Sequence, residues 1–245
     1  MLWRTPTVIG HRGTGCGVNA WGEAENTSAA MRRAYALGAR WAETDAQLSG
    51  DGELVDYHDL TLPDGRWLAD VSTADLAELG VERLADIVDA LPVDFGFDLE
   101  AKAAPSDVPG GGIRADTADA LADFARARIH ERPLVASSFD PGIVRRLVAA
   151  GIPTGWLGRS GWPWRETVWA AHRLGCAFAI GETPGVLLAP DAAEVARWAR
   201  ERSLDLAVWD ATGAHTRQLL DAGIKGLCTD DIAGVTSALL DESSD

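Results

Sequence analysis

The sequence predicts a (β/α)8 TIM barrel, an α/β fold in which eight parallel strands alternate with helices. Strand signals and helix signals alternate along the whole chain. Its 245 residues also suit such a barrel, which commonly occupies about 250 residues as one domain. The main rival is an open doubly wound sheet, but no GxGxxG or GxxxxGKS loop supports a nucleotide-binding version of it. We therefore expect a single domain over residues 1–245.

Eight short apolar runs have the length and composition of strands. They are Thr7–Gly10, Trp41–Asp45, Val93–Glu100, Leu134–Ser137, Thr154–Leu157, Ala177–Gly181, Leu206–Trp209 and Gly226–Thr229. Segments with helical spacing of apolar residues lie between and after them. These are Ser28–Leu37, Leu84–Leu91, Asp116–Ile129, Pro141–Ala150, Glu166–Leu174, Asp191–Arg202, Ala214–Ala222 and Ile232–Leu240.

The ends of these helices carry local signals. Asn26-Thr27 is a plausible N-cap for the first helix, and Leu84–Leu91 stops at Pro92. Several other helices end at a glycine just before the next strand, which is the expected left-handed cap. The glycines in question are Gly38, Gly151, Gly175 and Gly223.

The segment after the second strand, approximately residues 47–81, is too long for a simple loop. Asp51-Gly52 is a strong hairpin signal, so Glu53–Tyr57 is expected to fold back as a strand on an extended second strand. A short helix is expected to start near Ser72. We therefore predict a small hairpin-containing insertion at this point of the barrel. Asp107–Gly112 reads as a flexible loop after the third barrel strand.

The composition of the chain argues against several classes of function. A net charge of −15 argues against binding to nucleic acid or anionic membranes, and no apolar run approaches the roughly 18 residues that would insert stably in a membrane. The cysteines Cys16, Cys176 and Cys228 are odd in number and widely spaced, which favours a reducing compartment. No signal peptide fits before Gly10. We expect a cytoplasmic protein whose partner is a small molecule.

Carboxylates and histidines gather where strands end. Glu43 and Asp45 are two residues apart on a strand, so they share one face and can hold a hard cation together. His11 and His58 each follow an apolar strand beside such acids. A lone histidine in a loop is usually only solvated, but these two are placed to supply a base and an acid. That arrangement is what breaking a phosphate ester needs.

The third and seventh strands add to the same group, because the working residues of barrel enzymes lie at the C-terminal ends of strands. Asp98, Glu100 and Lys102 share one parity, and Trp209 ends the seventh strand. Lys102 beside Glu100 is either a plain ion pair or a point charge for a substrate phosphate. The tryptophans of the loop after strand five, Trp156, Trp162 and Trp164, suit either core packing or a substrate-facing wall.

An ordered set of motifs resembles the glycerophosphodiester phosphodiesterase family. The set comprises His11-Arg12-Gly13, Glu25-Asn26-Thr27, Glu43-x-Asp45, Asp51-Gly52, His58-Asp59, Leu99-Glu100-Ala101-Lys102, Ser138-Phe139, Trp209 and Gly226-Leu227-Cys228-Thr229-Asp230. The resemblance runs from Val8 to Asp231. It implies a barrel with one divalent cation, Mg²⁺ or Ca²⁺, held by Glu43, Asp45 and Glu100.

The same resemblance implies roles for the remaining residues. His11 and His58 would be the acid–base pair, and Arg12 and Lys102 would contact the phosphate, with Trp209 as a further substrate-binding residue. The expected activity is metal-dependent hydrolysis of glycerophosphodiesters to an alcohol and glycerol phosphate. Two alternatives stay open, a phospholipase-D-like phosphodiesterase of the same barrel family and a non-catalytic phosphate-binding barrel. The head group, the choice of cation and the oligomeric state are also open.

Overall fold

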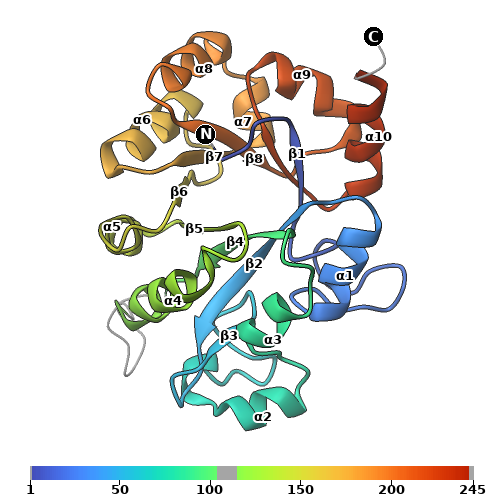
Figure 1. The fold of residues 1–245 in the computed structure, drawn as a ribbon, viewed down its shortest axis with the longest axis vertical. Coiled ribbons are helices and arrows are strands. Elements are labelled where there is room, and N and C mark those ends of the chain that lie inside the picture. The colour runs from blue at the N-terminus through green and yellow to red at the C-terminus, as the bar shows by residue number, and fades with distance from the viewer. Residues whose placement is uncertain (1, 104–114, 243–245) are drawn as a thin grey trace.

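The computed structural model describes residues 2–103 and 115–242 of the chain, and within them eight parallel strands close into a barrel (Figure 1). The strand order is β1-β9-β8-β7-β6-β5-β4-β2, and β1 also pairs with β2, which closes the ring. The strands are β1 (Thr7–Gly10), β2 (Trp41–Leu48), β4 (Gly96–Ala101), β5 (Leu134–Ser138), β6 (Thr154–Leu157), β7 (Phe178–Glu182), β8 (Asp205–Trp209) and β9 (Gly226–Thr229). The predicted TIM barrel is confirmed.

Helices surround the barrel and connect its strands (Figure 1). They are α1 (Ser28–Ala36), α2 (Thr73–Glu78), α3 (Leu84–Asp89), α4 (Ala115–Arg128), α5 (Pro141–Ala149), α6 (Trp164–Leu174), α7 (Thr183–Leu187), α8 (Ala192–Arg200), α9 (Thr216–Asp221) and α10 (Ile232–Glu242), with short 3₁₀ turns η1 (Leu68–Asp70) and η2 (Gly213–His215). Among these helices none combines the length and apolar character needed to cross a membrane.

The local signals act largely as the sequence suggested. Thr27 is the N-cap of α1, where its hydroxyl accepts from the N–H of Ala30 at 3.3 Å. Gly38 has φ of +103° just after this helix, and Gly175 caps α6 in the left-handed region. The predicted strand from Val93 begins only at Gly96, since residues 92–95 form a turn closed by an N–H···O bond of 3.0 Å.

Two further differences concern short elements. The five-residue helix α7 follows β7 directly and was not anticipated, because its sequence is too short for a helical period to show. The helix expected at Ala214–Ala222 is divided into η2 and α9. The loop expected at Asp107–Gly112 lies outside the described residues.

The segment after β2 folds back on it and packs around its own small core. β3 (Leu54–Asp56) pairs antiparallel with the end of β2, with Ala46 opposite Asp56. The side chains of this second core are Val55, Leu62, Leu68, Val71, Leu76 and Val81. Figure 1 shows β3 and α2 projecting beyond the barrel wall. The antiparallel return carries His58 back to the end of the barrel where Asp45 lies, because Tyr57 donates its N–H to the carbonyl of Asp45 at 2.9 Å.

An apolar cluster fills the barrel interior at the N-terminal end of the strands. Trp3 is buried there, with its ring 5.2 Å from that of Phe178 and 6.0 Å from that of Trp41. Ile9, Val135 and other small apolar side chains complete the layer. Because this end is closed by aromatic packing, the open space of the barrel lies at the opposite, C-terminal end of the strands.

Candidate active site

A cavity of about 310 Å³ opens among the C-terminal ends of the strands. Seven of the eight candidate site residues line it, namely His11, Arg12, Glu43, His58, Glu100, Lys102 and Trp209. The eighth, Asp45, is buried beside them and is 1% exposed. Segments far apart in the sequence therefore meet in one cavity, as the rule for parallel barrels requires.

Three carboxylates converge at one side of this cavity. One oxygen each from Glu43, Asp45 and Glu100 lies within 4.8 Å of the other two. β2 supplies the first two on one face, and β4 brings Glu100 opposite Asp45 through the parallel register. Oε1 of Glu43 is buried and has no hydrogen-bond partner within the described chain. A group of hard oxygen donors with an unsatisfied member suits a divalent cation.

The carboxylates differ in their electrostatic environment. Burial raises the pKa of Glu43 well above its usual range, and the neighbouring charges of Asp45 and Glu100 raise it further. Burial also raises the pKa of Glu100, although the Lys102 ammonium opposes it. For Asp45 burial acts in the same direction, but Lys102 and Arg12 outweigh it and lower the pKa. Without a cation, the negative charge is therefore distributed unevenly over the three carboxylates, and its burial costs free energy.

Two basic side chains lie against the acids. Nζ of Lys102 is 2.8 Å from Oε1 of Glu100 and 3.0 Å from Oδ1 of Asp45. Nε of Arg12 is 3.3 Å from Oδ2 of Asp45, and its NH1 donates to Glu25 at 3.1 Å. Burial lowers the pKa of both bases, but the nearby carboxylates raise it more, so both stay charged. Lys102 is thus ion-paired and also faces the cavity.

Arg12 is placed by an unusual backbone turn after β1. Its φ is +46°, in the left-handed region that side chains rarely adopt, and its N–H donates to Oε2 of Glu43 at 3.0 Å. Asn26 also has a positive φ, of +55°, and donates Nδ2–H to Oδ2 of Asp45 at 2.8 Å. The sequence pointed to Asn26 as part of a cap and of the Glu-Asn-Thr motif but assigned it no role at the site, so its hydrogen bond to Asp45 was missed. Its signal was the Glu-Asn-Thr motif.

His11 is held by a residue from the other end of the chain. Nδ1 of His11 lies 2.7 Å from Oδ1 of Asp230, which follows β9, and its Nε2 is 4.0 Å from Oε2 of Glu43. Burial raises the pKa of Asp230, but the hydrogen bond and charge of His11 outweigh it, so this pKa is lowered. Asp230 was present in a late motif but had no assigned role. Its pairing depends on β1 lying next to β9.

His58 stands at the outer part of the cavity. Its side chain is 37% exposed against 20% for His11, and its Nδ1 lies 2.7 Å from Oδ1 of Asp59. Each histidine therefore has a carboxylate at Nδ1, which favours a proton there and leaves Nε2 available. The two rings have the same support, but His58 is more open to solvent.

The remaining wall of the cavity is mostly apolar. Phe139, Leu157 and Ile180 line it together with Trp209. Asp98 also lines the cavity, and burial raises the pKa of its carboxyl to about 7. The tryptophans after strand five lie elsewhere: Trp156 and Trp164 are buried in the core and Trp162 is 43% exposed. Core packing is the correct reading for the first two.

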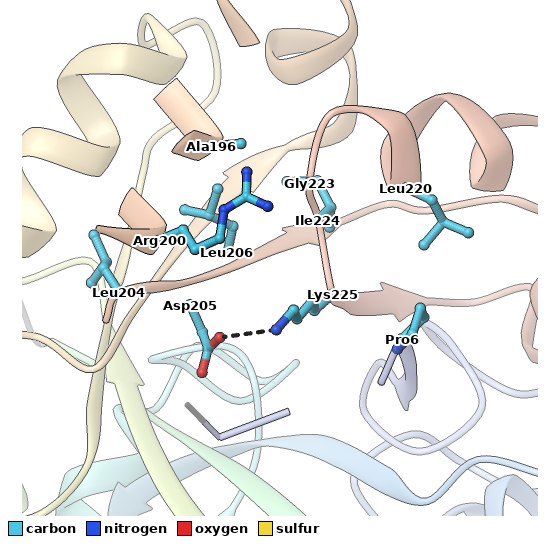
Figure 2. Close-up of a pocket in the computed structure, with 10 residues that line it drawn as sticks. All are labelled: Pro6, Ala196, Arg200, Leu204, Asp205, Leu206, Leu220, Gly223, Ile224 and Lys225. Carbon is cyan, nitrogen blue, oxygen red and sulfur yellow. Dashed lines mark ion pairs between the residues drawn. The ribbon is translucent and has the colours of Figure 1, made fainter. Parts of the chain in front are cut away.

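A second cavity, of about 250 Å³, lies at the opposite end of the strands (Figure 2). Its walls are largely apolar, and its polar members are Arg200, Asp205 and Lys225. The dashed line in Figure 2 joins Lys225 Nζ to Asp205 Oδ1 at 3.9 Å. Its lining residues include neither a histidine nor a group of carboxylates.

Comparisons with known proteins identify the family of this chain and support its fold. The model of the glycerophosphoryl diester phosphodiesterase family matches residues 11–233. A search of curated proteins gave no match. Among solved structures, a glycerophosphodiester phosphodiesterase from Thermotoga maritima is 23% identical, with a TM-score of 0.78 over 95% of this chain and 97% of that one.

Two other solved structures have the same fold. A phosphodiesterase from Oleispira antarctica, in complex with the product sn-glycerol-3-phosphate, is 22% identical with a TM-score of 0.76 over 96% of this chain and 97% of that one. A putative glycerophosphoryl diester phosphodiesterase from Silicibacter pomeroyi is 21% identical with a TM-score of 0.79 over 98% and 96%. At these identities the structures support the barrel fold itself.

Proposed function

Since this chain belongs to the glycerophosphoryl diester phosphodiesterase family, we propose that it hydrolyses glycerophosphodiesters with a divalent cation and two histidines. The products would be an alcohol and glycerol phosphate. The observation that carries this proposal is one cavity that combines three converging carboxylates, two histidines and two fixed cationic side chains. Hydrolysis of a diester needs all three groups. Negative charge must be compensated, one proton must be removed and another supplied, and the phosphate must be bound.

Glu43, Asp45 and Glu100 would hold the cation. Three carboxylates are a hard donor set, which suits Mg²⁺ or Ca²⁺. The unpartnered Oε1 of Glu43 and the raised pKa of its carboxyl, due to burial and to Asp45 and Glu100, are what a bound cation would relieve. When bound, the ion would polarise the phosphoryl oxygens and offset the negative charge that develops during reaction.

Arg12 and Lys102 would orient the phosphate. Their carboxylate partners hold both side chains in place, so little side-chain entropy is left to lose when a substrate binds. Arg12 presents a planar guanidinium that suits two phosphate oxygens, whereas Lys102 acts as a point charge. The indole of Trp209 would support the non-reacting part of the substrate, as an apolar surface beside the polar centre.

The two histidines would transfer the protons. His11, with Nδ1–H directed to Asp230, offers Nε2 as a base toward the cation side of the cavity. It would deprotonate the attacking group, which is either water or a neighbouring hydroxyl of the substrate. His58, at the more exposed part of the cavity, would protonate the departing alcohol. An alcohol leaving toward solvent suits that position.

We base the proposed substrate class and the proposed cellular compartment on separate observations. The Oleispira antarctica phosphodiesterase of the same fold binds sn-glycerol-3-phosphate, and we propose the same product here. The cysteines Cys16, Cys176 and Cys228 are free thiols, which suits a reducing compartment, and we propose a cytoplasmic enzyme.

The test is turnover of a panel of glycerophosphodiesters with choline, ethanolamine and glycerol head groups. The enzyme is first treated with chelator and then given Mg²⁺ or Ca²⁺. We expect release of glycerol phosphate only after a cation is restored. Turnover that survives complete chelation would remove the metal from the mechanism. A failure to hydrolyse any member with either cation would favour the non-catalytic phosphate-binding barrel.

A further inference from the structure

A second group of metal-ligating side chains lies at the rim of the active-site cavity. Sγ of Cys16 is 3.8 Å from Nδ1 of His11, which is itself 2.7 Å from Oδ1 of Asp230. One ligand atom from each of the three lies within 4.8 Å of the other two. Cys16 and Asp230 are both exposed, so an ion from solvent can reach them. The proposed mechanism gives Cys16 no role.

The loop after β1 holds Cys16 in this position. Gly15 donates its N–H to the carbonyl of His11 at 2.8 Å, and Cys16 donates its own to Oδ2 of Asp230 at 3.4 Å. Gly15 has φ of +100°, and a Cβ there would lie 2.9 Å from Cγ of Asp230. Glycine is therefore what allows the loop to close over Asp230 and to present the thiol beside the imidazole.

The distances suit tetrahedral coordination. Bonds of about 2.0 Å to nitrogen and oxygen and about 2.3 Å to sulfur place ligand atoms roughly 3.3–3.5 Å apart. The observed spacings of 3.8 and 2.7 Å lie on either side of that range, so shifts of a fraction of an ångström would suffice. The side chain of Asp230 is 52% exposed, which leaves it room to make such a shift.

The donor set distinguishes this group from the three carboxylates. Sulfur and imidazole nitrogen select zinc and similar borderline ions, whereas carboxylates alone suit Mg²⁺ or Ca²⁺. Burial raises the pKa of the Cys16 thiol, although Arg12 opposes it, so the free thiol is protonated and a weak nucleophile. An incoming divalent ion replaces that proton, as in other thiolate sites.

We propose that Cys16, His11 and Asp230 form an inhibitory site for Zn²⁺, separate from the carboxylate site that would hold Mg²⁺ or Ca²⁺. A water would complete the coordination, as in other sites with three protein ligands. A neutral imidazole bound through Nδ1 carries its single proton on Nε2. His11 then has no lone pair for the attacking group, and its hydrogen bond to Asp230 is lost. The inhibition rests on the proposed function, but the binding of zinc does not.

The binding arm of the test uses Co²⁺ as a spectroscopic probe. Enzyme saturated with Mg²⁺ is titrated with Co²⁺, and we expect a cobalt–thiolate absorption band in the near ultraviolet that Zn²⁺ abolishes by displacement. Cys16→Ala should lack the band. Cys176→Ala is the matched control, because Cys176 is a second free thiol outside this group, and it should keep the band. No band in the unmodified enzyme, or an equal band in Cys16→Ala, would overturn the site.

The activity arm measures turnover with Mg²⁺ in excess and rising Zn²⁺. We expect inhibition of the unmodified enzyme and of Cys176→Ala, while Cys16→Ala keeps its basal turnover and needs roughly tenfold or more Zn²⁺ for the same inhibition. Equal sensitivity of Cys16→Ala would show that zinc acts at the carboxylates, and a cobalt band without inhibition would overturn the inhibitory role. If no diester is hydrolysed at all, the proposed function fails, and the cobalt band still decides the site.

Discussion

Nδ1 of His11 lies 2.7 Å from Oδ1 of Asp230, although the two residues are 219 positions apart in the chain. The pairing of β1 with β9 sets this distance, because His11 directly follows β1 and Asp230 directly follows β9. A carboxylate in that position fixes both the orientation of the ring and the nitrogen that carries the proton. Asp230 is therefore a positioning residue for His11.

Replacing Asp230 by asparagine should lower kcat with little change in KM. The amide keeps the size of the carboxylate, but its N–H can donate a hydrogen bond to Nδ1, which allows the wrong tautomer. Positioned proton transfer is worth about 10²–10⁴-fold, and a loss of roughly ten- to a hundredfold is expected when the ring is only disoriented. The nitrogen shifts of His11 in NMR spectra should show the change of tautomer.

Asp231→Asn is the matched control for this variant. Asp231 is the next residue but accepts from the N–H groups of Gly234 and Gly213 instead of facing His11. We expect it to leave kcat close to that of the unmodified enzyme. Full kcat in Asp230→Asn, or an equal loss in Asp231→Asn, would contradict the positioning role.

His58→Ala should remove most turnover while leaving cation and substrate binding nearly intact. A general acid acts mainly in the transition state, where the leaving oxygen gains charge, so kcat should fall roughly 10²–10⁴-fold with little change in KM. A nitrophenyl ester, whose leaving group needs little protonation, should rescue His58→Ala more than His11→Ala. Equal rescue of both variants would mean that the roles are wrongly assigned.

Glu43→Gln should weaken the cation site itself. An ion at about 100 times its Kd stabilises the folded state by about 2.7 kcal/mol, so Mg²⁺ or Ca²⁺ should raise the Tm of the unmodified protein. The variant should need more cation for the same rise, and excess cation should partly restore its activity. Glu182→Gln is the control, because Glu182 also ends a barrel strand but accepts from Ser160. Identical cation responses in all three proteins would remove Glu43 from the site.

Asp51→Ala should destabilise the hairpin that carries His58. Hydrogen bonds from Ser49 and Thr73 lower the pKa of Asp51 to about 2. A depressed pKa gives stability that is present above the unfolded value of about 3.9 and is lost as pH falls through the folded value. The variant should therefore show a lower Tm at pH 7, and the difference should shrink between about pH 4 and pH 2.

Asp94→Ala, at an exposed acid before β4, is the comparison for this experiment. It should leave Tm nearly unchanged across the same range, since exposed surface substitutions are usually neutral. A Tm difference for Asp51→Ala that is constant down to pH 2 would show that its hydrogen bonds are not the cause. Thermal unfolding followed by circular dichroism suffices for both variants.

The sequence by itself determined the barrel. The alternating periodicity of strands and helices and the glycine caps are local signals, which can be read without knowing the tertiary structure. It also predicted the carboxylates of β2, since residues at i and i+2 of a strand necessarily share a face. Lys102 and Glu100 followed from the same parity. These inferences needed only the two-residue periodicity of side chains along a strand and the rule that the active sites of barrels lie at the C-terminal ends of the strands.

Only the tertiary structure decided which distant residues support that site. Asp230 meets His11 because the barrel closes, Asn26 reaches Asp45 through a left-handed turn, and Cys16 lies beside His11 because a glycine loop folds over the mouth. No periodicity along the chain specifies such contacts. They depend on the ring of strands closing and on backbone conformations of single residues, which are settled by packing across the whole molecule.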